Sequence, residues 1–95
     1  MNQLVLSACI AEVGALRHTP AGLPVMDFHL EHASELEEAG QQRQVRAAIR
    51  AVAFGATAER VGRQSLGSAW RFIGFLAAAR GGRQLVFHVL DFQPD

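Results

Sequence analysis

Arginine is the residue type in this sequence best suited to a chemical role. All nine basic residues are arginine, and the chain contains no lysine and no tyrosine. A guanidinium group pairs with phosphate through parallel hydrogen bonds and stacks on a base through its planar face. The missing lysine excludes Schiff-base enzymes and the P-loop lysine, and the missing tyrosine excludes a tyrosine general acid. The basic residues therefore favour binding of phosphate over catalysis.

Charge is distributed unevenly along a chain whose formal net charge is zero. Residues 27–38 contain five acids and no arginine, whereas residues 43–83 contain eight arginines and a single acid, Glu59. Phosphate backbones respond to the local potential rather than to the net charge of the whole chain. The arginine-rich segment is therefore either a nucleic-acid-binding surface or a solvated basic face.

Five arginines and the only tryptophan are the candidate nucleic-acid-binding residues. They are Arg17, Arg46, Arg50, Trp70, Arg80 and Arg83. Arg80 and Arg83 flank two glycines, which predicts a flexible turn that carries two guanidinium groups between two strands. Sequence-tolerant binders of single strands combine such positive charge with aromatic stacking. Trp70 fits either a stacking position or the hydrophobic core.

The other reactive side chains form no catalytic or metal-binding motif. His29 and His32 are three residues apart in a strand-like run, which places them on opposite faces, and no zinc-ligand spacing is present. Cys9 has no second cysteine to pair with, and we expect it to be a small buried apolar residue. We therefore expect a binding protein rather than an enzyme, with no metal and no cofactor.

Alternation of apolar and polar residues predicts the strands that position these side chains. The predicted strands are residues 3–11, 25–32, 68–78 and 84–92, separated by turns rich in glycine and proline. Residues 41–54 fit two structures. A helix would gather an apolar stripe from Val45 to Ala53 and is slightly favoured by the alanines, whereas a strand would direct Arg46 and Arg50 outward.

Little other helix is predicted. Residues 34–37 have the pattern of a capping box, with Gly40 ending a short helix, and residues 56–62 predict one more helical turn. Four or five strands within 95 residues indicate an all-β fold, a small barrel that forms one domain over residues 1–95. We expect a homodimer, because so short a chain buries a limited share of its surface and the last strand is apolar on both faces. With neither a signal peptide nor a membrane-spanning run, we expect a cytoplasmic protein that does not contact the membrane.

The chain resembles the primosomal replication protein N (PriB) family along nearly its whole length. The matching segments are residues 2–7, 20–24, 28–32, 37–40, 43–44, 66–68, 74–75 and 85–88. The most specific of these are Leu-Glu-His at residues 30–32 and Glu-Glu-Ala-Gly at residues 37–40.

This resemblance implies a five-stranded OB-fold homodimer related to single-stranded DNA-binding proteins, without their acidic tail. It implies a bacterial protein that binds single-stranded DNA, the restart helicase PriA and other primosome components when stalled forks restart. Residues 43–54 would then be a strand and residues 33–42 a loop. Arg17 and Arg80 match basic positions of the family, whereas Arg46 stands where the family can carry a stacking tryptophan.

Two alternative functions fit the same residues. The first is an OB-fold interaction module that bridges replication proteins and binds DNA weakly, which the missing tryptophan and the short loop at residues 79–83 favour. The second is a small RNA-binding OB-fold, because RNA and DNA both offer phosphates and bases and differ at the 2′-hydroxyl.

Overall fold

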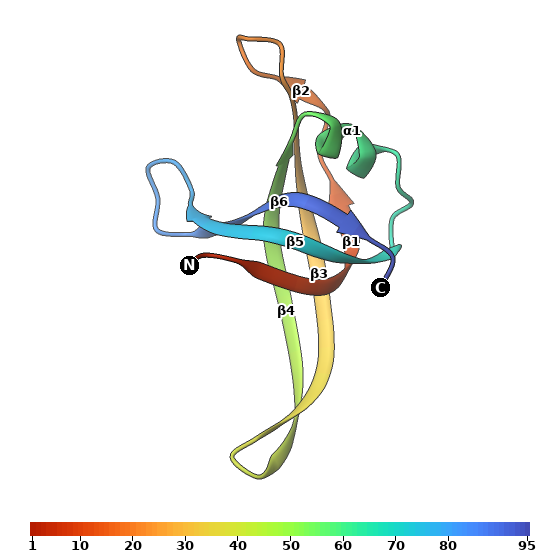
Figure 1. Ribbon diagram of the computed structural model, residues 1–95, viewed down its shortest axis with the longest axis vertical. Helices are drawn as coiled ribbons and strands as arrows, with labels where there is room; N and C mark the ends of the chain where they lie inside the picture. The colour runs from red at the N-terminus through yellow and green to blue at the C-terminus, as the bar shows by residue number, and fades with distance from the viewer.

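Five strands close into a barrel in the computed structural model, which describes residues 1–95 (Figure 1). The barrel strands are β1 (Leu4–Val13), β3 (Pro24–Glu38), β4 (Gln41–Phe54), β5 (Ala69–Ala78) and β6 (Leu85–Gln93). The short strand β2 (Arg17–His18) pairs with the beginning of β3, and the helix α1 (Ala56–Gly62) connects β4 to β5. No helix is long and apolar enough to cross a membrane.

The strand order is that of an OB-fold. Neighbouring strands follow the order β1-β5-β6-β4-β3, and pairing of β1 with β3 closes the barrel. All pairs are antiparallel except β4 with β6, which are parallel and joined by Ala51↔Phe87 and Val52↔His88. A closed five-stranded barrel with a helix between its third and fourth strands confirms the predicted fold class.

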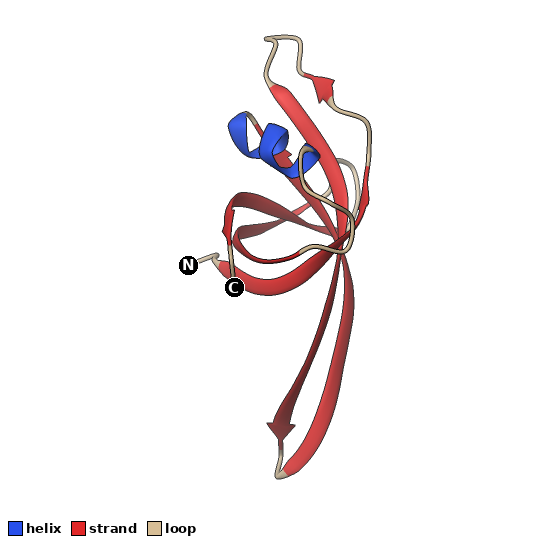
Figure 2. Ribbon diagram, turned by 90° about the vertical axis from the view of Figure 1, so that its right-hand side faces the viewer, coloured by secondary structure: helices blue, strands red, loops and turns tan.

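Alternate residues of the strands fill the barrel with aromatic rings. Phe28, Phe72, Phe87 and Phe92 are all almost fully buried, and the Phe72 ring lies 5.5 Å from that of Phe92 and 6.3 Å from that of Phe28. Full burial of one such ring contributes about 1.5–3 kcal/mol to folding. Helix α1 covers one end of this core with its buried residues Ala58 and Val61 (Figure 2).

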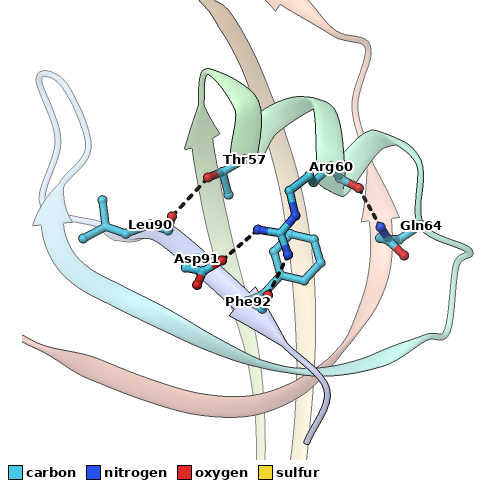
Figure 3. A network of polar contacts seen from close by, with 6 residues as sticks. All are labelled: Thr57, Arg60, Gln64, Leu90, Asp91 and Phe92. Carbon is cyan, nitrogen blue, oxygen red and sulfur yellow. Dashed lines mark hydrogen bonds and ion pairs between the residues drawn. The ribbon is translucent and has the colours of Figure 1, made fainter.

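Polar contacts fasten α1 to β6 (Figure 3). Arg60 donates from Nη1 to the Asp91 carboxylate at 2.7 Å and from Nη2 to the Phe92 carbonyl at 2.8 Å. Its guanidinium carbon also lies 4.2 Å from the centre of the Phe92 ring, and Thr57 donates to the Leu90 carbonyl at 3.0 Å. Hydrogen bonds from Arg60 and from the Phe92 backbone lower the pKa of Asp91 below its ordinary value. Arg60 therefore has a structural role, because its guanidinium group connects α1 to β6.

A two-stranded arm extends beyond the barrel, at the bottom of Figure 1. It consists of residues 33–46, in which β3 and β4 pair with each other and with no third strand. Its tip is a two-residue turn in which Ala39 and Gly40 have positive φ angles of 53° and 80°. Positive φ at both central residues matches the twist of the flanking strands and allows this tight connection.

The hairpin of β3 and β4 corrects three expectations. Residues 41–54 form a strand rather than the slightly favoured helix, and residues 33–42 form two strands and a turn rather than a loop. The capping-box helix at residues 34–37 is also wrong, because this segment belongs to β3. The continuous ladder between β3 and β4 overrides local helix propensity, which is a weak preference. The helical turn at residues 56–62 and the other four predicted strands are confirmed.

Candidate nucleic-acid interface

Three of the candidate arginines come together on the outer face of the barrel. Arg17 comes from β2, Arg50 from β4, and Arg80 from the loop between β5 and β6. We call these three residues the basic face. A hollow of about 290 Å³ lies within it; its lining includes Arg50, Arg80, Asp27, His88, Val52 and Val86.

Packing fixes the loop that carries Arg80. Ala79, the residue before it, packs against a small buried cluster formed by Val25, Val52 and Val86 on β3, β4 and β6. The loop is closed by a hydrogen bond from the Ala79 N–H to the Gln84 carbonyl at 2.7 Å. Arg80 is therefore held beside Arg50 by the fold of the barrel itself.

One acid neutralises part of the basic face. Asp27, on β3, accepts a hydrogen bond from Arg17 Nε at 2.9 Å, and the same carboxylate oxygen lies 2.9 Å from Arg17 Nη2. Both side chains remain about half exposed, so the pair contributes at most about 1 kcal/mol. A bound phosphate would compete with Asp27 for Arg17.

Arg46 and Arg83 lie at the borders of this arrangement. Arg83 is exposed in the same loop as Arg80. Arg46 lies four residues before Arg50 on the same face of β4, which corresponds to about 13 Å along a strand. Arg46, Arg50, Arg80 and Arg83 form no ion pair with a carboxylate. These four guanidinium groups therefore remain free to bind an anion.

Trp70 lies apart from the basic face. Its ring packs edge-on against Phe92, with the centroids 5.2 Å apart and the planes at 83°. Its Nε1–H donates to the Ser68 hydroxyl at 2.9 Å, and the side chain is half-buried against the main core. The proposed stacking role of Trp70 stays a prediction, and its position is the one expected of a core residue.

The structure adds three rings that sequence reasoning missed. Phe54 on β4, His88 on β6 and Phe75 on β5 form a row on the outer face of neighbouring strands. The signal for Phe54 was present in the sequence, because a strand at 41–54 places it on the same face as Arg46 and Arg50. A helix over the same residues also fits the sequence, so this strand face could not be assigned from the sequence alone.

The histidines of β3 make separate contacts. His32 hydrogen-bonds through Nδ1 with the Ser7 carbonyl at 2.6 Å and through Nε2 with the Ser34 hydroxyl at 2.8 Å, whereas His29 lies 3.7 Å from the Glu12 carboxylate. No group of three histidine, cysteine or acidic side chains is placed to hold a metal ion.

Comparison with known proteins identifies relatives over most of the chain. Residues 2–91 match the model of a family described as another single-strand binding protein family. The replication restart protein PriB of Bordetella pertussis is 50% identical over 80 residues, which are 84% of this chain and 75% of the relative. PriB of Nitrosomonas europaea is 41% identical over 91 residues, which are 95% of this chain and 84% of that protein.

Solved structures agree with the sequence matches. The structure of PriB from Ralstonia solanacearum has a TM-score of 0.90 and 33% identity, and the alignment covers 99% of this chain and 97% of that chain. The single-stranded DNA-binding protein of Thermus aquaticus shares the fold with a TM-score of 0.77 at 24% identity, covering all of this chain and 50% of that one. The matches in sequence and in structure together show that this chain belongs to the PriB family.

Proposed function

We propose that this protein binds single-stranded DNA through the basic face and acts in the restart of bacterial replication forks. The observation that carries the proposal is the convergence of Arg17, Arg50 and Arg80 on one outer face of an OB-fold barrel. Strand faces and loops of OB-folds are the surfaces that bind oligonucleotides. Named relatives of this chain are replication restart proteins, which supports the cellular role.

The binding mechanism is electrostatic capture of the DNA backbone. Arg46 and Arg50 follow one face of β4, and Arg80 and Arg83 extend the positive surface into the loop between β5 and β6. Each phosphate that an arginine neutralises releases counterions, so binding weakens as salt rises. Phosphates are common to all sequences, and this mechanism therefore gives sequence-tolerant binding.

We propose that two copies associate through the edge of β1. Residues 4–8 pair with β5 on one side, and pairing with β3 on the other side begins only at Cys9. A strand edge of this kind offers backbone N–H and C=O groups to a strand of another chain. The outward-facing Val5 beside this edge is 52% exposed. Sedimentation equilibrium should give twice the chain mass of 10.3 kDa, and a monomer mass would contradict the dimer.

We also propose assembly with the restart helicase PriA and other primosome components in the cytoplasm. The restart role in the names of the relatives supports this step. Unwinding of a forked DNA by the helicase should increase when the protein is added. An unchanged rate, with DNA binding intact, would contradict the partnership.

Fluorescence polarisation of a labelled oligo-dT of about 30 nucleotides tests the central proposal, since single OB-fold sites span about 4–16 nucleotides. The same titration with duplex DNA and with RNA, each at two salt concentrations, provides the comparison. Tight, salt-sensitive binding that prefers single-stranded DNA is expected. Absent or millimolar binding would favour the interaction module, and a preference for RNA would favour the RNA-binding alternative.

A further inference from the structure

Three rings from three neighbouring strands lie nearly parallel on the outside of the barrel. The His88 ring is 4.8 Å from Phe75 and 6.1 Å from Phe54, with 15° between the planes in each pair. His88 is in the middle of this aromatic row, and Phe54 is at one end with 43% of its surface exposed. Contact with His88 on one side holds the Phe54 ring in place.

The aromatic row adjoins the basic face. His88 also lines the hollow that contains Arg50 and Arg80, so one residue belongs to both features. Neither arginine is paired with a carboxylate. Phe54 lies four residues after Arg50 on the same face of β4 and is joined to the hollow through His88. Aromatic rings and free guanidinium groups on one surface are the combination found in sites for single strands, in which bases stack while positive charge holds the backbone.

We propose that Phe54, held in place by His88, is the ring on which an unpaired base stacks while neighbouring phosphates contact Arg50 and Arg80. This inference rests on the proposed function and adds to it the residue that contacts the base. Phe54 would thus supply an aromatic stacking surface, which is missing at position 46 because an arginine stands there. His88 and Phe75 act as positioning residues.

Two observations favour a base over other reasons for an exposed phenylalanine. The barrel core is already filled by Phe28, Phe72, Phe87 and Phe92, so Phe54 contributes little to it. If a second copy docked here with two-fold symmetry, the same patch of both chains would form the interface. The positive surfaces around Arg50 and Arg80 on the two copies would then face each other, and like charges repel.

The test compares two ligands of equal length, oligo-dT and an abasic oligonucleotide that has the backbone without the bases. Phe54→Leu keeps an apolar side chain and removes the ring. Losing one stacked base should weaken oligo-dT binding by about 5- to 150-fold and leave abasic binding unchanged. Phe54→Trp should restore the preference for oligo-dT, and Leu66→Ala, at an exposed apolar position outside the aromatic row, should change neither ligand.

Other results distinguish a failure of this inference from a failure of the proposed function. Equal binding of oligo-dT by wild type and Phe54→Leu would overturn the inference and leave the proposed function intact. Equal loss for both ligands would also overturn it, because Phe54 would then act on the fold rather than on a base. Wild-type protein that binds neither ligand would overturn the proposed function itself, and the inference with it.

Discussion

Arg17 and Asp27 form an ion pair at 2.9 Å within the face that we propose for DNA binding. The guanidinium group expected to meet a phosphate therefore already has an anionic partner in the free protein. Asp27 also lines the hollow with Arg50 and Arg80, so its negative charge opposes the binding of a DNA phosphate there.

Replacing this acid should strengthen DNA binding. Asp27→Asn removes one negative charge and frees Arg17, and an exposed pair is worth at most about 1 kcal/mol, which corresponds to about a fivefold gain in affinity. Polarisation with oligo-dT measures the effect. Glu59→Gln removes an exposed acid from α1, outside the basic face, and is the control. A gain no larger than that of the control would exclude Arg17 from the site.

The loop between β5 and β6 should contribute to the salt dependence. Arg80→Ala combined with Arg83→Ala should weaken binding and reduce the slope of log K against log salt by about 0.7 for each phosphate that the protein no longer neutralises. Arg63→Ala with Arg71→Ala removes the same charge from two arginines that do not line the hollow. Identical slopes for the two double variants would mean that the loop binds no phosphate specifically.

The fluorescence of Trp70 tests directly whether this side chain stacks on a base or belongs to the core. It is the only tryptophan in a chain without tyrosine, so protein emission reports on this one position. Because its ring packs on Phe92 away from the basic face, we expect saturation with oligo-dT to leave the emission nearly unchanged. Strong quenching at saturation would instead place Trp70 against a base.

The contact between α1 and β6 should make stability depend on pH in acid. The hydrogen bond from Arg60 comes first among the causes that lower the pKa of Asp91 below 3.8 in the folded protein. The contribution is therefore fully present above the unfolded value of about 4 and is lost as the pH falls through the lower folded value. Urea midpoints of wild type and Asp91→Asn should converge on acidification. A constant difference between them would contradict this assignment.

Gly74 is required by the close approach of β5 to β6. A Cβ at this position would lie 1.8 Å from the His88 carbonyl oxygen and 3.0 Å from the Phe87 ring. Gly74→Ala should therefore destabilise the protein by about 1–3 kcal/mol or more, measured by urea unfolding. Gly82→Ala meets no atom closer than 3.7 Å and should be nearly neutral. Comparable midpoints for the two variants would show that the strands separate at little cost.

Strand alternation was sufficient to find four of the five barrel strands, because one face of each meets a core that excludes polar side chains. The fifth, β4, was ambiguous because its many alanines fit a helical stripe as well as a buried strand face. The arm could not be recognised, since its residues are almost all exposed and carry no core-facing pattern. Membership in the PriB family confirms the prediction of a binding protein rather than an enzyme.

The candidate site was predictable in part. The basic residues stood out by type, and Arg17, Arg50 and Arg80 do come together. Their pairing with Asp27 and their proximity to His88 depend on register and barrel closure, which bring β2, β3, β4 and β6 side by side. Phe54, His88 and Phe75 come from three different strands, and no local sequence pattern predicts that their rings are adjacent.

The parallel pairing of β4 with β6 is the shortest ladder in the barrel, with two residue pairs. Its strands are far apart in sequence, so closing it costs more chain entropy than forming the hairpin between β3 and β4. The barrel should therefore open first along this seam, as local unfolding begins where pairing and packing are weakest. Arg50 lies on β4 and Arg80 in the loop that leads into β6, so DNA bound to both arginines would hold the two strands together. By mass action DNA would then stabilise the closed barrel, and resistance to unfolding would rise with DNA concentration.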